Sequence, residues 1–278
     1  MLTGPFLDRN WMGENKDYGS SDIVMLGLPF DGTVSYRPGS RFAPEQIRLA
    51  SWGLEEYSPY FDKHLEDCNF HDAGDLEFPL GNTYKSLELI EKNVEDIYRD
   101  GKRVFGIGGE HLVTLPEIKA VSKFYKDLAI VHFDAHTDLR EEYLGEEMSH
   151  SAVIRHSGNI VGFENLKQIG IRSGMKDEFE LMKKYNTRAF EYKDLDVLRD
   201  KPIFVTVDLD VLDTSIMCGT GTPEVGGLTF NELLGWFKYL SNFNIVGADV
   251  VELAPDYDSS GASTAVATKV IRELLMAM

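Results

Sequence analysis

LAIVHFDAHTD, at residues 128–138, joins an apolar run to a cluster of acidic and imidazole side chains. The run Leu128–Phe133 predicts a buried strand, because strands covered on both faces are continuously apolar. On an extended chain, alternate side chains project to the same side. We therefore expect Asp134, His136 and Asp138 to converge on one point where the strand ends.

A second acidic cluster follows a second apolar run. Asp208 and Asp210 come directly after Pro202–Val207 and share one side of an extended chain in the same way. Four carboxylates packed at the ends of buried strands repel one another and lose hydration. Divalent cations are the simplest way to satisfy them, so the sequence predicts a metalloenzyme.

The rest of the chain alternates apolar runs with amphipathic patterns, which is typical of a parallel sheet covered by helices on both faces. We expect strands at Ile23–Leu28, Asn69–Ala73, Arg103–Ile107, Leu128–Phe133, Leu166–Ile171, Pro202–Val207 and Ile245–Val250. We expect helices at Ala43–Trp52, Thr83–Arg99, Val113–Phe124, Lys176–Lys184, Thr229–Ser241 and Ser263–Met276. No long linker or repeat divides the chain. The predicted fold class is a three-layer α/β/α sandwich with a mostly parallel sheet, as a single domain over residues 1–278.

Open α/β sheets bind ligands beyond the carboxyl ends of their strands. The segment Gly108–His111 and the side chain of Glu252 also fall at such ends. The candidate metal ligands are His111, Asp134, His136, Asp138, Asp208 and Asp210. Six ligands exceed the four that one tetrahedral zinc takes, and they suit two divalent ions. Oxygen ligands with some imidazole favour manganese, although cobalt, nickel or iron can occupy such a site in vitro.

Simpler interpretations exist for single members of this set. One aspartate at a strand end, such as Asp138, often caps the following helix, and a lone histidine is often structural. Capping does not require acidic and imidazole groups in alternation, so the joint D-x-H-x-D and D-x-D spacings favour metal binding. The glycines of Gly106–Gly109 also suggest a dinucleotide loop, but the full G-x-G-x-x-G pattern is absent.

The chain is acidic, with 28 Lys and Arg against 46 Asp and Glu residues and a net charge of −18. This charge disfavours nucleic acid and anionic membranes as partners, because phosphate groups require a basic surface. It modestly favours a cationic substrate through long-range attraction, although most of these charges simply keep a surface soluble. No stretch has the apolar length of a membrane span.

Cys68 and Cys218 are too few for a disulfide framework, which favours a reducing compartment. Residues 1–9 lack the basic segment followed by an apolar segment that marks a secretory signal. We expect the protein to be cytoplasmic.

Three ordered motifs resemble the metal-binding signatures of the ureohydrolase family, which contains arginase and agmatinase. They are GGEH at 108–111, FDAHTD at 133–138 and DLDVLD at 208–213. Further similar segments are YRPGSRFAP at 36–44, GTGTPEVGG at 219–227 and DVVE at 249–252, so the resemblance spans nearly the whole chain.

The resemblance implies a hydrolase with two Mn2+ ions per subunit and a small cationic guanidino substrate. It places one ion between His111, Asp134, Asp138 and Asp208, and the other between Asp134, His136, Asp208 and Asp210. It also implies that His150 binds substrate and relays a proton to the leaving amine. Glu252 aligns with the catalytic carboxylate that grips the substrate guanidinium.

Agmatinases look closer than arginases within this family. The loop Leu139–Ser149 lacks the Asn- and Ser-rich pattern with which arginases hold the α-amino and α-carboxylate groups of arginine. The resemblance thus implies hydrolysis of agmatine to putrescine and urea, a step of polyamine biosynthesis, in a homo-oligomer that is a trimer or hexamer. Alternatives within the family are a guanidinobutyrase, an aminopropylagmatine ureohydrolase, an arginase or a formiminoglutamase. Outside it, a non-catalytic metal-binding scaffold and a nucleotide-binding module remain open.

Overall fold

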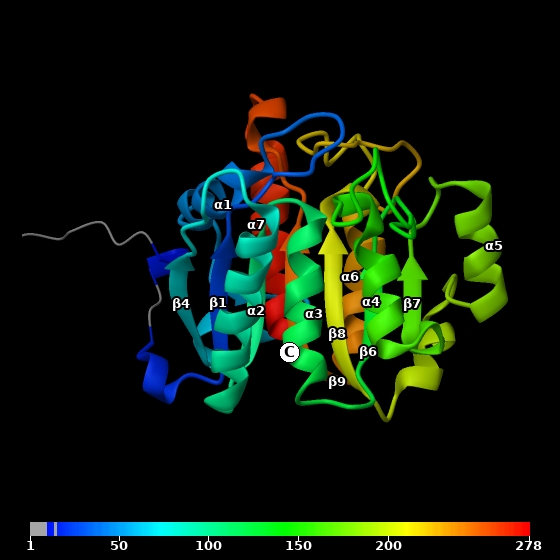
Figure 1. Ribbon diagram of the computed structural model, residues 1–278. Helices are drawn as coiled ribbons and strands as arrows, with labels where there is room; N and C mark the ends of the chain where they lie inside the picture. The colour runs from blue at the N-terminus through cyan, green and yellow to red at the C-terminus, as the bar shows by residue number, and fades with distance from the viewer. Residues whose placement is uncertain (1–9, 14–15) are drawn as a thin grey trace, which may run out of the picture.

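The apolar runs form a sheet in which every neighbouring pair of strands is parallel. The computed structural model describes residues 10–13 and 16–278, and residues 1–9, on which the expectation about a secretory signal rests, lie outside them. Within the described residues the sheet has seven strands in the order β4-β1-β5-β9-β8-β6-β7. Their bounds are β1 Ile23–Leu28, β4 Phe70–Asp75, β5 Arg103–Gly108, β6 Ala129–Phe133, β7 Leu166–Ile169, β8 Pro202–Asp208 and β9 Asn244–Val251 (Figure 1).

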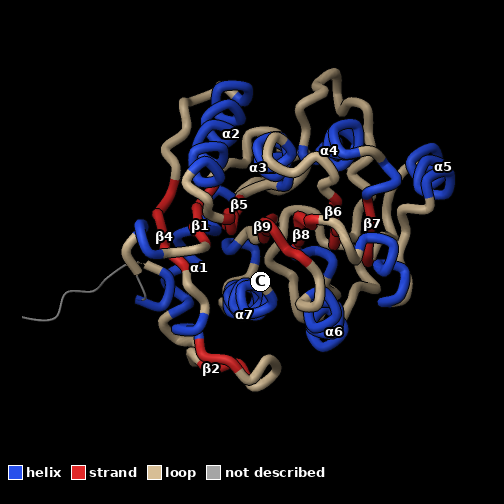
Figure 2. Tube along the Cα trace, turned by 90° about the horizontal axis from the view of Figure 1, so that it is seen from below, coloured by secondary structure: helices blue, strands red, loops and turns tan. Residues whose placement is uncertain are grey.

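Helices cover both faces of this sheet, which explains why its central strands are mostly apolar (Figure 2). The edge strand β4 instead contains polar and partly exposed residues. One layer contains α2 (Thr83–Arg99), α3 (Thr114–Ser122) and α4 (Val153–Val161), with α5 (Lys176–Tyr185) beyond them near β7. The other layer contains α1 (Ala43–Ser51), α7 (Ala262–Ala277) and α6 (Phe230–Leu240). The predicted three-layer α/β/α fold is therefore confirmed.

Each face of the sheet has its own apolar core. On β6, Phe133 points to one layer, where its ring meets that of Phe237 of α6 edge to face at 5.8 Å. Ile130 of the same strand belongs to the other core, together with Ile118 of α3 and Val153 of α4. The two cores hold the strand between them, and this fixes the position of the residues that follow its carboxyl end.

The structure differs from the sequence expectation in a few elements. Helix α4 was not predicted, and neither was the short antiparallel pair β2 (Tyr57–Ser58) and β3 (Lys63–His64). Strand β7 ends at Ile169 instead of Ile171, because Gly170 adopts a left-handed φ of 89°. No helix that the described residues form has the length and hydropathy needed to cross a membrane.

Candidate metal centre

Four neighbouring strands, β5, β9, β8 and β6, end at the same edge of the sheet (Figure 1). Asp208 is the last residue of β8, and Asp134 directly follows β6. Glu252 directly follows β9, and His111 begins a short 3-10 helix after β5. The parallel topology thus brings together residues from four distant parts of the chain.

The turn after β5 depends on a glycine. A Cβ atom at Gly109 would lie 1.9 Å from the carbonyl oxygen of Phe30, so no side chain fits there. The carbonyl of Gly109 accepts the backbone N–H of Glu252 at 2.8 Å. Glu252 itself has a left-handed φ of 68°, and its Oε1 accepts the backbone N–H of His111 at 2.8 Å. Glycine at position 109 therefore allows the backbone of Phe30 to pack closely against it. The two hydrogen bonds to Glu252 connect the ends of β5 and β9.

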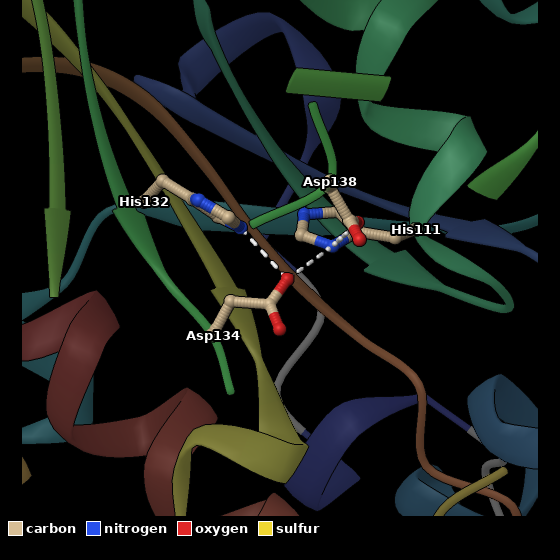
Figure 3. Close-up of side chains that lie close together, drawn as sticks. All are labelled: His111, His132, Asp134 and Asp138. Carbon is tan, nitrogen blue, oxygen red and sulfur yellow. Dashed lines mark hydrogen bonds and ion pairs between the residues drawn. The ribbon is translucent and has the colours of Figure 1, made fainter. Parts of the chain in front are cut away.

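One group of side chains surrounds the Nδ1 atom of His111, which is fully buried (Figure 3). This atom lies 3.2 Å from Oδ2 of Asp134 and 3.2 Å from Oδ2 of Asp138. It lies 3.4 Å from Oδ2 of Asp208. The other ring nitrogen, Nε2, is 2.9 Å from the hydroxyl of Thr206 on β8.

A second group surrounds the Nδ1 atom of His136. It lies 3.0 Å from Oδ2 of Asp210 and 3.4 Å from Oδ1 of Asp134. Asp210 is held in place by the backbone, because its Oδ1 accepts the N–H of Ala135 at 3.0 Å. Asp208 in turn accepts the N–H of Asp210 at 2.8 Å. Asp134 belongs to both groups, and the structure brings together all six residues that the sequence predicts as ligands.

His132 also belongs to the first group, although it is not among the predicted ligands (Figure 3). Its Nε2 lies 2.8 Å from Oδ2 of Asp134, and its Nδ1 lies 3.2 Å from the side-chain amide nitrogen of Gln168. His132 was assigned to the buried interior of a strand. Its spacing of two residues from Asp134 was the signal that places both side chains on one side of β6.

The acidic groups have divergent pKa values. Burial raises the pKa of Asp208 well above its usual value, and the nearby Asp210 and Asp134 raise it further. Burial and then Asp134 likewise raise the pKa of Asp210. Burial alone would raise the pKa of Asp134 too, but the charge of His132 and the nearby ring of His111 hold that pKa well below its usual value. The raised pKa values of Asp208 and Asp210 show that the side chains around them do not supply enough positive charge to balance the carboxylates.

The donor set fits divalent cations. The Nδ1 atom of His111 is buried and has no hydrogen-bond partner, although three carboxylate oxygens lie within 3.4 Å of it. A cation among these atoms accepts the imidazole lone pair and neutralises the carboxylates, which is how buried charges are normally satisfied. Two clusters that share Asp134 suit two such ions better than one.

His150 and Glu252 form a pair beside the six candidate metal ligands, which we call the metal-type cluster. The Nδ1 atom of His150 lies 3.6 Å from Oε1 of Glu252. Both side chains are buried. Burial alone would lower the pKa of His150, but the hydrogen bond and charge of Glu252, with smaller contributions from Asp138 and Glu110, raise that pKa to about 9. The imidazole is therefore mostly protonated at neutral pH and can donate a proton.

A second buried carboxyl, Glu110, supports the loop that carries His150. Glu110 accepts the backbone N–H of Thr33 at 2.8 Å and also the Thr33 hydroxyl. That hydroxyl oxygen accepts the N–H of His150 at 3.1 Å, and the His150 ring reaches the hydroxyl of Ser35 at 3.0 Å. Glu110 and Thr33 were not predicted as functional residues, although Glu110 lies inside the GGEH motif. Burial raises the pKa of Glu110 to about 8.

A pocket opens onto both halves of the site. His136, Asp138, Asp208 and His150 are among the residues that line it. Farther from these groups the pocket is lined by Ser35, Arg140, Tyr143, Met175, Glu178 and Thr222, among others. One pocket therefore gives access both to candidate metal ligands and to His150.

A parallel α/β sheet that gathers carboxylates and imidazoles at its strand ends, beside a buried histidine whose pKa is raised, is the arrangement of a metal-dependent hydrolase. The model of the arginase family matches residues 21–277, and the chain belongs to that family. This confirms the predicted family, and the chain is a hydrolase whose histidine and aspartate cluster is compatible with a binuclear metal site.

Similar proteins extend over nearly the full chain. The agmatinase of Bacillus subtilis is 48% identical over 275 residues, which is 96% of this chain and 95% of that protein. The agmatinase of Bacillus anthracis is 49% identical over 271 residues, which is 94% of this chain and 93% of that protein. A solved structure from Clostridium difficile, there provisionally called an agmatinase, is 47% identical with a TM-score of 0.90, over 94% of this chain and 98% of that one.

Proposed function

We propose that the protein hydrolyses agmatine to putrescine and urea. The observation that carries this proposal is the convergence of two imidazole Nδ1 atoms and four carboxylates beside the pair of His150 and Glu252. The similarity to bacterial agmatinases over more than nine-tenths of the chain supports agmatine as the substrate. The reaction adds water to the guanidinium carbon and releases the amine as the other product.

The proposed cofactor is a pair of Mn2+ ions, since carboxylate oxygens with imidazole suit this metal. The residues that would hold them are His111, Asp134, Asp138 and Asp208 for one ion, and Asp134, His136, Asp208 and Asp210 for the other. When bound, such ions acidify water and stabilise developing negative charge.

Glu252 is the proposed partner of the substrate guanidinium, because a carboxylate holds this planar cation through paired, charge-assisted hydrogen bonds. Its Oε1 already accepts the His111 N–H, which fixes the side chain toward the site. His150 is the proposed proton donor. The leaving amine departs only when it is protonated, and His150 carries a proton at neutral pH since its pKa is raised to about 9.

The proposal is tested with protein loaded with manganese and a panel of substrates. Urea release from agmatine, arginine and guanidinobutyrate is compared with formamide release from formiminoglutamate. We expect agmatine to give the highest kcat/KM. Faster turnover of another substrate would reassign the enzyme within its family, and no turnover of any would leave a metal-binding scaffold.

The same family and composition support several further proposals. Putrescine formation places the enzyme in polyamine biosynthesis. The acidic composition and the two unpaired cysteines support a cytoplasmic location. We propose a single domain over the whole chain, because the sheet contains strands from its beginning to its end. A trimer or hexamer is proposed from the family resemblance alone.

A further inference from the structure

Behind the metal-type cluster lies a pair of buried acids that the proposed function does not use. Glu117 on α3 and Asp249 on β9 are both fully buried. Both carboxyl oxygens of Glu117 and Oδ1 of Asp249 have no hydrogen-bond partner. No ion pair among the described residues involves either side chain. Two buried carboxylates without a counter-charge, with three of their four oxygens lacking a hydrogen-bond partner, are very costly if both are ionised.

A glycine makes room for the two acids. Gly106 of β5 pairs with Asp249 in the register between β5 and β9. A Cβ atom at Gly106 would lie 2.8 Å from Oε1 of Glu117 and 2.9 Å from Cβ of Asp249. The carboxyl of Glu117 therefore lies over Gly106 and next to Asp249. This arrangement is built into three elements, β5, β9 and α3.

A line of hydroxyl groups joins Asp249 to the candidate metal ligand His111. The hydroxyl of Thr114, on α3, donates to Oδ2 of Asp249 at 2.6 Å. The hydroxyl oxygens of Thr114 and Thr206 are 3.4 Å apart. Thr206 lies 2.9 Å from Nε2 of His111. The path thus runs from the acid pair to the ring whose Nδ1 faces three aspartates.

The direction of these hydrogen bonds follows from the chemistry of the groups. An ionised Asp249 can only accept hydrogen bonds, so the Thr114 hydroxyl donates its one hydrogen bond to Asp249. Thr114 then accepts from Thr206, and Thr206 accepts from the N–H at Nε2 of His111. A neutral imidazole with its proton on Nε2 has a free lone pair on Nδ1, and this is the tautomer that binds a metal through Nδ1.

We infer that Glu117 is a neutral carboxylic acid that donates its proton to Oδ1 of Asp249, and that this pair fixes the metal-binding tautomer of His111 through Thr114 and Thr206. A proton between the two carboxyls satisfies the oxygens that otherwise lack partners. Burial, followed by the charge of Asp249, raises the pKa of Glu117 well above its usual value. Glu117 is thus a positioning residue, and the part of this inference that concerns metal binding rests on the proposed function.

Infrared spectroscopy of the full chain tests the protonation directly, before and after loading with Mn2+. At neutral pH we expect the carbonyl band of a protonated carboxylic acid in both states. The band should shift with 13C-labelled glutamate, and Glu117→Gln should remove the Glu117 component of it. Glu110→Gln identifies the component that comes from Glu110, whose pKa is raised to about 8. A band that is unchanged in Glu117→Gln would contradict the inference. The absence of the band, or a band that shifts only with labelled aspartate, would overturn the inference.

Metal affinity tests the positioning role, measured by calorimetry with Mn2+ alone. In Glu117→Gln the amide N–H2 still donates to Asp249, so the affinity should stay within about threefold of the wild type. Glu117→Leu removes the donor and Asp249→Asn removes the charge, and each should weaken binding about 10–100-fold. Thr268→Val, which removes a buried hydroxyl in α7, controls for a general loss of packing.

Equal Mn2+ affinity in Glu117→Gln, Glu117→Leu and the wild type would overturn the positioning role. If Glu117→Leu does not fold, Asp249→Asn and the infrared band still decide the question. The two proposals fail separately. A chain that shows the Glu117 band but hydrolyses no guanidino substrate contradicts the proposed function alone, and an active enzyme without the band contradicts this inference alone.

Discussion

The candidate ligands converge through turns that simple alternation along a strand does not produce. Asp138 has a left-handed φ of 50°, and its carbonyl accepts the N–H groups of Ile154 and Arg155 at the start of α4. Asp210 lies in a 3-10 helix that begins where Asp208 accepts its N–H. The spacing of the motifs was enough to predict which side chains are candidate ligands. It does not predict the turns that position them, because those turns depend on contacts with segments distant in the sequence.

His132 provides a test of how far neighbouring groups determine metal binding. Replacing it with alanine removes the imidazole that lies 2.8 Å from Asp134, the carboxylate common to both clusters. We expect Mn2+ affinity to fall about 10–100-fold, because groups that orient a ligand typically contribute this much. Calorimetric titration measures the change, with His156→Ala as a control histidine outside the cluster. Unchanged affinity in His132→Ala would show that Asp134 is oriented without it.

His150 is expected to act on turnover without holding metal. Its Nδ1 faces Glu252, and no described candidate ligand is its hydrogen-bond partner. His150→Ala should lower kcat for agmatine on the order of a hundredfold, because it removes the proton donor. Metal content, measured by elemental analysis, should stay at the wild-type level. A variant with normal kcat would remove the proton-relay role, and one that lost metal would make His150 part of the metal site.

The helices and strands were predictable to different degrees. Each of the seven strands was expected within a few residues of its observed bounds. For the central strands the reason is that burial on both faces leaves a continuous apolar run. Helix α4 was missed because Val153, Ile154 and Gly158 have low helix propensity. Tertiary contacts override that propensity. A Cβ atom at Gly158 would lie 2.6 Å from the ring of Phe163, so the glycine allows α4 to pack closely against the residues that follow it.

A buried ion pair joins α1 to β4, and its stability contribution should depend on pH. Arg48 donates two hydrogen bonds of 2.8 Å to Asp72. Burial disfavours the charged carboxylate, but the hydrogen bonds and charge of Arg48 lower the pKa of Asp72 in the folded state. The contribution is therefore full above the unfolded pKa of about 3.9 and is lost as the pH falls through the folded value.

Asp72→Asn should lower the free energy of unfolding by about 1.5–3 kcal/mol at pH 7, because it removes the buried counter-charge of Arg48 and leaves only the partly exposed Asp75. The difference from the wild type should shrink below about pH 4, where Asp72 becomes protonated in the unfolded chain. Urea unfolding at several pH values measures both effects. Asp196→Asn, at an exposed ion pair with Arg199, is the matched control and should change little. A difference that does not vary with pH would contradict the role of the Asp72 charge.

The order of strands in the sheet is what turns separate motifs into one site. The motifs after β5, β6, β8 and β9 are far apart in sequence, and they meet because these four strands are neighbours. Because the motifs follow the carboxyl ends of predicted parallel strands, the sequence predicts that they lie at one edge of the sheet. It does not predict which strands are neighbours. The same topology places Asp249 and Gly106 side by side behind His111. The candidate metal ligands and the acid pair therefore depend on a single arrangement of β5, β9, β8 and β6.

Removing metal should destabilise the whole molecule, because the carboxylates of Asp134, Asp208 and Asp210 then face one another in a buried site. Mn2+ at 100 times its Kd contributes about 2.7 kcal/mol to folding by mass action. Since 1 kcal/mol shifts Tm by roughly 2–4 °C in a chain of this size, exhaustive treatment with a chelator should lower Tm by about 5 °C or more. Asp210→Asn relieves part of the repulsion, so its metal-free form should melt above metal-free wild type, although it gains less from added Mn2+. Scanning calorimetry measures all four states. An identical Tm with and without metal, together with full turnover after chelation, would show that these carboxylates coexist without cations.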